Sequence, residues 1–531
     1  MIKKEHKVSL TLLLATILLS TALAAESPQN EPAHHQSLKR SLETTLKETK
    51  VSNDNVIMMV EMIRHGSRAP FSSDFTAPWI TETGIGELTD SGKRMEYYLG
   101  LNTRARYPSF FKDGFKYNEY FLRSTPVNRT LMSGMSHYLG LVTNFNSKKL
   151  IFQNSDPRLF PPQINQKSPP LFNISDIKFD TPLPDGFNPF PIYSMWPEDT
   201  KLGLNRYNCK PLRKIQEKAW TDANAYLNQS KYFTKMMQDI VKVYNITDKR
   251  FLGDPLLKQC YFMSDFAIMD VLNNPEPKIK EGSEMYVFLQ RCNALYVFQR
   301  HNGSISASLS AGPILEQIST YFEEKTLGAK GKPLPLKFVL YSAHDTTLGA
   351  QLSTLGLQWT NSSCLLDQLY TGNFVQTGCF LYPAVGSNLV WELIEPTKGS
   401  YEVKVSYNGG YLDYCKTGKK DKSGEFYCTL GEFKSSVAKY SYAKSDQFCG
   451  LGPQTTGIFG SKIGWILVIL CVVFLIYGIV MTFLFLRLKG EGSDRDDYGV
   501  AENLYHSPGG SNSDQHTPVS EKKWKKKSTK G

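Results

Sequence analysis

Two arginines bracket one histidine directly after an apolar run, in VIMMVEMIRHGSRAPF at residues 56–71. Arg64 and Arg68 are permanent cations, and their charge opposes protonation of His65 between them. Repulsion among such groups is a poor way to stabilise a fold, so the arrangement predicts that an anion binds here. The planar forks of arginine suit the oxygens of a phosphoryl group. A neutral imidazole that faces phosphorus is a nucleophile.

Two further segments carry polar residues where apolar runs end. Arg123 lies near the end of FKYNEYFLRST at 115–125, and His344 and Asp345 follow KFVLYS at 337–342. If these strands are neighbours in an open α/β sheet, their carboxyl ends lie at the edge where ligands bind. We therefore expect three guanidiniums, two imidazoles and one carboxyl to surround a single anion.

The elements that position these residues can be predicted from spacing. The runs at 56–63, 115–125 and 337–342 predict buried strands, and helical spacing at 88–111 and 131–142 predicts helices. Strands that alternate with helices favour an α/β fold, with a mixed, mainly parallel sheet flanked by helices.

An insertion interrupts this alternation. The chain is rich in Pro and Asn from 150 to 200 and mostly helical in pattern over 205–325, which predicts a mostly helical cap subdomain at about 150–325. Short alternating segments follow at 376–450, with a hairpin signal at Asn408-Gly409. We expect the folded domain to cover 56–455.

The two ends of the chain have other compositions. Residues 1–24 combine lysines, an apolar run and small residues, the pattern of a cleaved secretory signal, and 25–55 is a polar segment. Residues 463–486 carry no charge and are long enough to span a bilayer as a helix. Basic residues follow at once, which predicts a cytosolic tail at 487–531 and a type I, single-pass topology.

Cysteines and sequons agree with a lumenal domain. Eight of the nine cysteines lie outside the apolar span, which predicts four disulfides in an oxidising compartment but leaves their pairing open. Glycosylation sequons begin at Asn128, Asn173, Asn228, Asn245, Asn302 and Asn361. The net charge is +11, without a basic helix or interleaved basic and aromatic residues, so we expect no nucleic-acid partner.

The motifs in order resemble those of the histidine acid phosphatases, a branch of the histidine phosphatase superfamily. RHGSRAP at 64–70 matches the family's RHGxRxP at every fixed position. RSTPVNRTLMS at 123–133 resembles its arginine segment, YSAHDTT at 341–347 its C-terminal signature, and LTDSGKR at 88–94 the start of a helix. The chain departs from the family pattern at Met95, Pro126 and Asn128.

The resemblance implies an acid phosphatase that hydrolyses small-molecule phosphate monoesters through a phosphohistidine, with no metal or other cofactor. His65 would be the nucleophile and Asp345 the general acid, which must be protonated at the start and so favours acid pH. Four side chains would bind the phosphoryl oxygens: Arg64, Arg68, Arg123 and His344. Relatives are often dimers, so the resemblance leaves a homodimer open.

The resemblance also implies disulfides and glycosylation sites. The implied pairs are Cys209–Cys449 and Cys260–Cys364; Cys415–Cys428 could then close a local loop, and Cys292 remains with Cys379. Because Arg123 should point into the site, we expect Asn128 to be partly buried and unmodified. The candidate glycosylation sites are then Asn173, Asn228, Asn245, Asn302 and Asn361.

Other functions stay open from the sequence. A phytase, an inositol-polyphosphate phosphatase or a lysophospholipid phosphatase would use the same chemistry on a special ester. A non-catalytic lumenal receptor could share the scaffold, although it would have no need to keep both His65 and Asp345. The topology predicts a location in the lysosome or endosome, or at the cell surface.

Overall fold

The computed structural model divides the chain into two parts, within residues 1–452 and 453–531. It describes residues 55–71, 80, 84–114, 116–142, 149–151, 153–156, 159, 176–184, 187–195, 202, 209–301, 304–327, 332–354, 362–374, 383–440, 448–449 and 462–490. The predicted signal, the polar segment before residue 55 and the tail beyond residue 490 lie outside these ranges.

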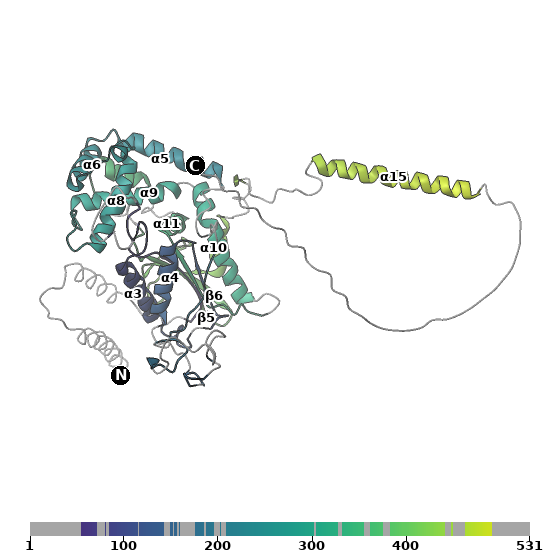
Figure 1. Ribbon diagram of the computed structural model, residues 1–531, viewed down its shortest axis with the longest axis horizontal. Helices are drawn as coiled ribbons and strands as arrows, with labels where there is room; N and C mark the ends of the chain where they lie inside the picture. Colours follow the sequence, from purple (N-terminus) through teal and green to yellow (C-terminus); the bar gives the residue numbers. More distant parts are fainter. Residues whose placement is uncertain are drawn as a thin grey trace, which may run out of the picture. The chain divides into compact units, whose positions relative to one another are not determined.

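A mixed β-sheet runs through the first part (Figure 1). Its strands lie in the order β3-β2-β4-β1-β5-β6-β7, with β8 paired to β6. Parallel pairing joins β1 Val56–Arg64, β2 Tyr120–Ser124, β3 Ile192–Ser194 and β4 Phe338–Ala343. Antiparallel pairing adds β5 Asn388–Thr397, β6 Ser400–Tyr407, β7 Gly410–Tyr411 and β8 Cys428–Thr429. The predicted mixed sheet is confirmed, and its parallel half contains the three strands that precede the predicted site residues.

Helices cover both faces of this sheet. One face carries α3 Asp90–Arg106 and α4 Asn128–Leu141, which pack side by side (Figure 1). The other carries α10 Ser304–Leu327 and α11 Asp345–Thr354, with the shorter α12 Ser362–Thr371 and α13 Leu430–Ala438 nearby in the same core. Strand β1 is apolar because it is buried on both sides: Met58, Val60 and Met62 belong to one core, and Met59 and Ile63 to the other.

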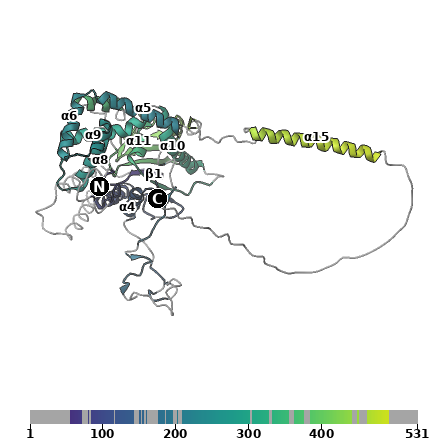
Figure 2. The same cartoon turned by 45° about the horizontal axis from the view of Figure 1, so that its top comes forward.

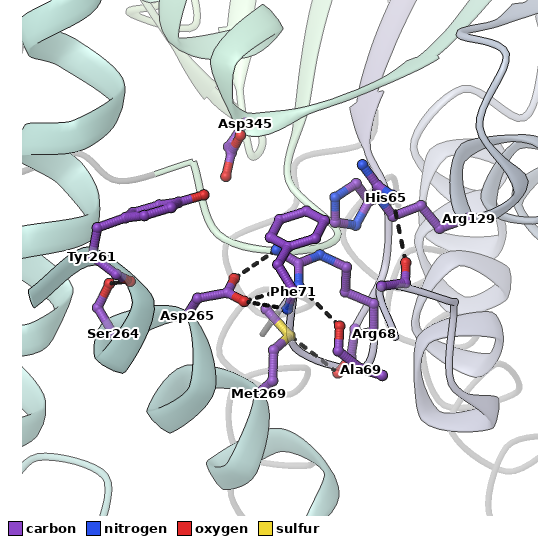
Figure 3. Close-up of polar contacts among 12 residues, drawn as sticks. His65, Arg68, Ala69, Phe71, Arg129, Tyr261, Ser264, Asp265, Met269 and Asp345 are labelled. Atoms are coloured by element: carbon purple, nitrogen blue, oxygen red, sulfur yellow. Dashed lines mark hydrogen bonds and ion pairs between the residues drawn. The ribbon is translucent and has the colours of Figure 1, made fainter. Parts of the chain in front are cut away.

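The predicted helical cap is present. Its helices gather above one end of the sheet in both views (Figures 1 and 2). They are α5 Lys210–Leu227, α6 Lys231–Tyr244, α7 Lys249–Leu252, α8 Leu256–Asn273 and α9 Glu284–Phe298, followed by the 3-10 helix η5 Gln299–His301. The insertion therefore stands over the sheet edge where the predicted site residues lie, with α8 nearest to them (Figure 3).

Short-range signals also predicted local structure. The turn between β6 and β7 is formed by Asn408 and Gly409, both at positive φ (46° and 84°), as the Asn-Gly pair indicates. Helix α3 begins after Thr89, whose side chain accepts a hydrogen bond from the backbone N–H of Gly92.

Two disulfides agree with the expected pairs and one corrects them. Cys209 is bonded to Cys449 and Cys415 to Cys428. The pair Cys260–Cys364 is wrong, because Cys260 is bonded to Cys292. These two cysteines lie on the adjacent helices α8 and α9, which bring their Cα atoms to 5.9 Å. The remaining pair Cys292–Cys379 is therefore also wrong, and Cys364 is bonded to a cysteine outside the described residues.

The expectation that Asn128 is partly buried is wrong. The side chain is exposed at the start of α4 and donates to the Glu87 carboxylate at 3.1 Å. Asn228 and Asn245 are also exposed, each at the C-terminus of a cap helix, so both stay candidates for glycosylation. The other three candidates, Asn173, Asn302 and Asn361, lie outside the described residues.

The second part of the chain contains one long helix, α15 Lys462–Gly490. Within it, residues 469–487 have a mean hydropathy of 2.9 and are not buried by any other segment. Among the described residues this is the single helix long and apolar enough to cross a membrane, and it covers most of the predicted span at 463–486.

Candidate active site

Three parallel strands bring the predicted histidines together. Arg64 at the end of β1 is paired in register with Ala343 at the end of β4, and β2 lies on the other side of β4. The ring of His65 therefore lies 5.7 Å from the ring of His344, edge to face. Figure 3 shows His65 with Arg68 and Arg129 beside it and Asp345 opposite. The prediction that strand ends assemble one site is confirmed for His65, His344 and Asp345.

The turn after β1 depends on a close approach to α3. A Cβ atom on Gly66 would lie 2.4 Å from the carbonyl oxygen of Gly92, so only glycine fits there. Thr89 donates from both its backbone N–H and its hydroxyl to the carbonyl of Ser67, at 3.0 Å each. The backbone N–H of Gly66 donates to the Ser133 hydroxyl at 3.1 Å. Helices α3 and α4 thus hold the turn that carries His65.

His65 is buried, with only 2% of its surface exposed. Its Nδ1 lies 2.9 Å from the carbonyl oxygen of Gly66. A carbonyl can only accept, so Nδ1 carries the proton and the lone pair is on Nε2. Burial, followed by the charges of Arg129 and Arg64, holds the pKa of His65 well below 6.5. The lowered pKa favours the neutral imidazole, the form that the sequence predicted.

Asp345 and Arg64 form an ion pair beside His65. Nη2 of Arg64 lies 3.0 Å from Oδ2 of Asp345, and Nη1 donates to the carbonyl of Pro383 at 2.5 Å. Burial alone would raise the pKa of Asp345, but Arg64 and the neighbouring cations outweigh it and the pKa lies below 3.8. The ion pair thus favours the ionised carboxylate of Asp345 in the free protein.

Arg68 forms a second buried ion pair that the sequence did not predict. Its Nη2 and Nη1 donate to the two carboxylate oxygens of Asp265 on α8, at 2.6 and 3.1 Å. Both side chains are at most 3% exposed. No motif pointed to Asp265, because it comes almost 200 residues after Arg68, within a helical segment of apolar character.

The third guanidinium at this site belongs to Arg129 rather than Arg123. Arg123 lies within β2, and its Nη2 lies 2.9 Å from the sulfur of Met195 beyond β3. Arg129 lies in the first turn of α4, and its charge is one of the main causes of the lowered pKa of His65. The ring of Phe71 lies 3.5 Å from the Arg68 guanidinium carbon and 5.0 Å from that of Arg129.

Arg129 remains a cation in this environment. Burial, and then the charge of Arg68, lowers its pKa to about 10, so it is fully protonated at acid and neutral pH. The sequence contained a signal for it, because Arg129 belongs to the same RSTPVNRTLMS segment as Arg123. What the sequence could not show is which of the two side chains faces His65.

His344 is held from β2 and α4. Its Nε2 lies 2.9 Å from the hydroxyl oxygen of Thr125, which in turn lies 2.8 Å from that of Thr130. This chain of contacts fixes the orientation of the His344 ring. The contacts place His344 where an anion beside His65 would meet it.

Two buried glutamates lie beneath the site. Glu61 of β1 is fully buried and pairs with His137 of α4 at 3.2 Å, and the hydroxyl of Thr103 donates to it at 2.9 Å. Glu96 of α3 is also fully buried, and neither carboxylate oxygen has a hydrogen-bond partner among the described residues. Burial, and then the charge of Glu61, raises the pKa of Glu96 well above 4.5 although Arg64 opposes this.

Glu96→Gln is expected to stabilise the protein at pH 7.5 but not at pH 4. A raised pKa in the folded state means that the unfolded chain loses its proton first, so stability falls as pH rises above about 4.3. Glutamine removes this loss. The melting temperatures of the two proteins should differ at pH 7.5 by roughly 1 °C for each kcal/mol recovered, because the shift per kcal/mol falls as the chain becomes longer. The exposed Glu281→Gln is the control; an equal shift at both pH values would contradict the prediction.

An aromatic pocket lies next to the site in the cap. It has a volume of about 490 Å³ and includes Trp220, Tyr261, Tyr296 and Arg300 in its lining. The rings of Tyr261 and Tyr296 stack at 3.5 Å, and Arg300 lies 3.6 Å from the Tyr296 ring centre. Figure 3 shows the Tyr261 hydroxyl pointing toward Asp345. One tyrosine thus connects the pocket with the carboxyl group of the site.

Comparisons with known proteins agree on one family. A model of the histidine phosphatase superfamily (branch 2) matches residues 55–408. Lysosomal acid phosphatase of Xenopus laevis is 28% identical over 322 residues, which cover 59% of this chain and 66% of that protein. Prostatic acid phosphatase of Mus musculus is 26% identical over 335 residues, covering 59% and 76%. The chain thus spans slightly less than two thirds of the Xenopus relative.

Among solved structures, the phytase of Citrobacter braakii matches 74% of this chain and 99% of its own, with a TM-score of 0.49 and 15% identity.

Proposed function

The chain belongs to the histidine phosphatase superfamily (branch 2), and from this premise we propose that it is an acid phosphatase. It would hydrolyse phosphate monoesters through a phosphohistidine. The proposal assigns the nucleophile to His65 and the general acid to Asp345. The phosphoryl oxygens are bound by Arg64, Arg68, Arg129 and His344.

The observation that carries the proposal is the state of His65. Its proton is fixed on Nδ1 by the Gly66 carbonyl, so Nε2 offers a lone pair. Its pKa lies well below 6.5 because of burial and neighbouring guanidiniums. The same guanidiniums attract a phosphoryl group and stabilise the negative charge of its transition state. The same guanidinium charges therefore keep the nucleophile His65 neutral and bind the phosphoryl group that it attacks.

Arg129 takes the role that the sequence assigned to Arg123. It acts on His65 electrostatically, whereas the described contact of Arg123 is with Met195. The N-terminus of α4 adds partial positive charge at the same place.

Asp345 stands opposite the nucleophile and can move a proton to the leaving oxygen. Its ion pair with Arg64 keeps it ionised in the free protein. When phosphate binds, the added negative charge and the competition for Arg64 raise the proton affinity of Asp345. After the alcohol leaves, the same carboxylate can activate the water that hydrolyses the phosphohistidine.

The proposal includes a membrane topology. A cleaved signal at 1–24, a lumenal domain at 56–455, a span at 463–486 and a cytosolic tail at 487–531 account together for the apolar ends and the disulfides. The location would be the lysosome or endosome, or the cell surface. The lumenal domain acts on small-molecule esters.

The test is a pH–rate profile of the full chain in membranes with an aryl phosphate, which suits the aromatic pocket beside Asp345. We expect a maximum below pH 6 that is insensitive to a chelator. Activity persists at acid pH because His65 stays neutral there, and it declines at higher pH as the proton for the leaving group is lost. A well-folded chain without activity between pH 4 and 8 would contradict the proposal.

A further inference from the structure

Asp265 connects the cap to the phosphate-binding turn. Its two carboxylate oxygens accept from Nη2 and Nη1 of Arg68 at 2.6 and 3.1 Å, and Oδ2 also accepts from the backbone N–H of Phe71 at 3.1 Å. Asp265 is 2% exposed and Arg68 1%. The carboxylate of an ion pair is therefore buried beside Arg68, one of the cations that act on His65, in a site that we propose to bind an anion.

This ion pair engages both terminal nitrogens of the Arg68 guanidinium. A guanidinium binds a phosphoryl group most tightly with two parallel N–H groups, but both terminal nitrogens of Arg68 are engaged by Asp265, and Nη1 also donates to the Ala69 carbonyl. Nε is buried and has no hydrogen-bond partner among the described residues. Arg68 therefore offers a ligand two N–H groups, one on Nε and one on Nη2, and its charge is partly balanced before the ligand arrives.

The other charged groups near Asp265 come from three elements. Arg129 of α4 interacts electrostatically with both Asp265 and Asp345. Tyr261, one turn earlier on α8, faces the same two carboxylates together with Arg68. The tyrosine keeps its proton, because burial and the carboxylates raise its pKa well above 10. The carboxyl groups of this set are those of Asp265 and Asp345.

By Coulomb's law, the cost of a fixed negative charge scales with the charge of the bound anion. A doubly charged phosphoryl group is therefore penalised about twice as much in free energy as a singly charged one. A phosphate monoester changes between these forms near pH 6. We propose that Asp265, by its charge and its hold on Arg68, makes this site select the singly charged, protonated form of the phosphate ester.

The proposal rests on the proposed function and explains where the proton comes from. Asp345 is held as a carboxylate by Arg64, so it needs a proton to serve as acid. The ester ROPO₃H⁻ brings one. Nε2 of His65 forms the bond to phosphorus as the P–OR bond breaks, and the ester's proton passes through the Asp345 carboxylate to the leaving oxygen. The products are ROH and phosphohistidine, and the total charge stays at −1.

The experiment uses two tetrahedral anions whose charges do not change with pH. Sulfate (2−) and methyl sulfate (1−) are titrated by calorimetry into the full chain in detergent at pH 5, and as competitors of aryl phosphate hydrolysis. For Asp265→Asn we expect methyl sulfate to bind about threefold more tightly and sulfate about tenfold, the square of that factor. Asp270→Asn, a buried aspartate on the same helix bonded to Asn274, is the matched control and should change neither.

Several outcomes would overturn the inference. If Asp265 merely holds Arg68 in place, Asp265→Asn weakens both anions by the same factor. If it has no influence, neither affinity changes. Should the variant fail to fold, the wild type decides alone: sulfate bound more than about tenfold more tightly than methyl sulfate would contradict selection of single charge. Selective binding in a wild type without hydrolysis would refute the proposed function while leaving the anion preference established.

Discussion

Replacing His65 with alanine will lower kcat/KM for an aryl phosphate at pH 5 by at least about 10⁴-fold, because the atom that bonds to phosphorus is lost. The guanidiniums of the site remain, so the variant should still bind inorganic phosphate. Steady-state kinetics and calorimetric titration with phosphate, run in parallel, separate the two effects. Loss of turnover with binding kept identifies the nucleophile.

The intermediate provides a second readout for the same variant. Wild-type protein quenched during hydrolysis of a radiolabelled ester should carry label in an acid-labile, base-stable linkage, as phosphohistidine does. His65→Ala should carry none. Label on another residue, or turnover that survives in the variant, would mean that the nucleophile lies elsewhere.

Thermal unfolding checks that the variant is folded. The pKa of His65 is lowered in the folded state by burial and nearby cations, so its contribution to stability is present above about pH 6.5 and is lost as pH falls. The variant lacks this group. Its melting temperature should therefore fall less between pH 7 and pH 5 than that of the wild type.

Much of the site could be predicted because parallel strands end at a common edge. The apolar run of β1 and the run of β4 are buried on both faces, and such runs are recognisable by composition. Once they are placed in one sheet, His65, His344 and Asp345 must lie close together. The turn after β1 is indicated by the glycine in the sequence, and the structure gives the reason: only glycine fits at position 66 against Gly92.

What failed were contacts between segments far apart in the chain. Asp265 lies in an apolar helix of the cap, and nothing in its neighbours shows that α8 packs against the turn after β1. The disulfide Cys260–Cys292 likewise could not be predicted, because it forms only where α8 and α9 are adjacent in the cap. Sequence spacing predicts the faces of each helix, but the packing of helices within the cap is a tertiary property.

The structure favours Arg129 over the predicted Arg123 beside His65 for a local reason. The strand was expected at 115–125, with Arg123 near its end and its side chain in the site. Instead β2 continues to Ser124 and pairs with β4 throughout, so Arg123 stays in the sheet. The helix that follows begins at Asn128 and turns Arg129 toward the site.

Arg129→Ala is expected to lower kcat/KM by about 10²- to 10³-fold, the effect of removing one preorganised group that stabilises transition-state charge. Arg123→Ala, six residues before Arg129 in the same segment, should change it by less than about threefold, as for a side chain outside the transition-state contacts. Both substitutions replace an arginine with alanine, so a difference in kcat/KM between the two variants cannot come from a difference in the charge or size that is removed. Kinetics at pH 5 with one aryl phosphate measure both.

The pair of variants also tests how Arg129 acts. Because its charge lowers the pKa of His65, Arg129→Ala should move the acid limb of the kcat/KM profile to higher pH, whereas Arg123→Ala should leave it in place. Arg129→Lys keeps the charge and should restore the position of that limb without restoring the full rate, since lysine lacks the planar fork. A larger loss in Arg123→Ala than in Arg129→Ala would reverse the assignment and return the phosphate-binding role to the strand.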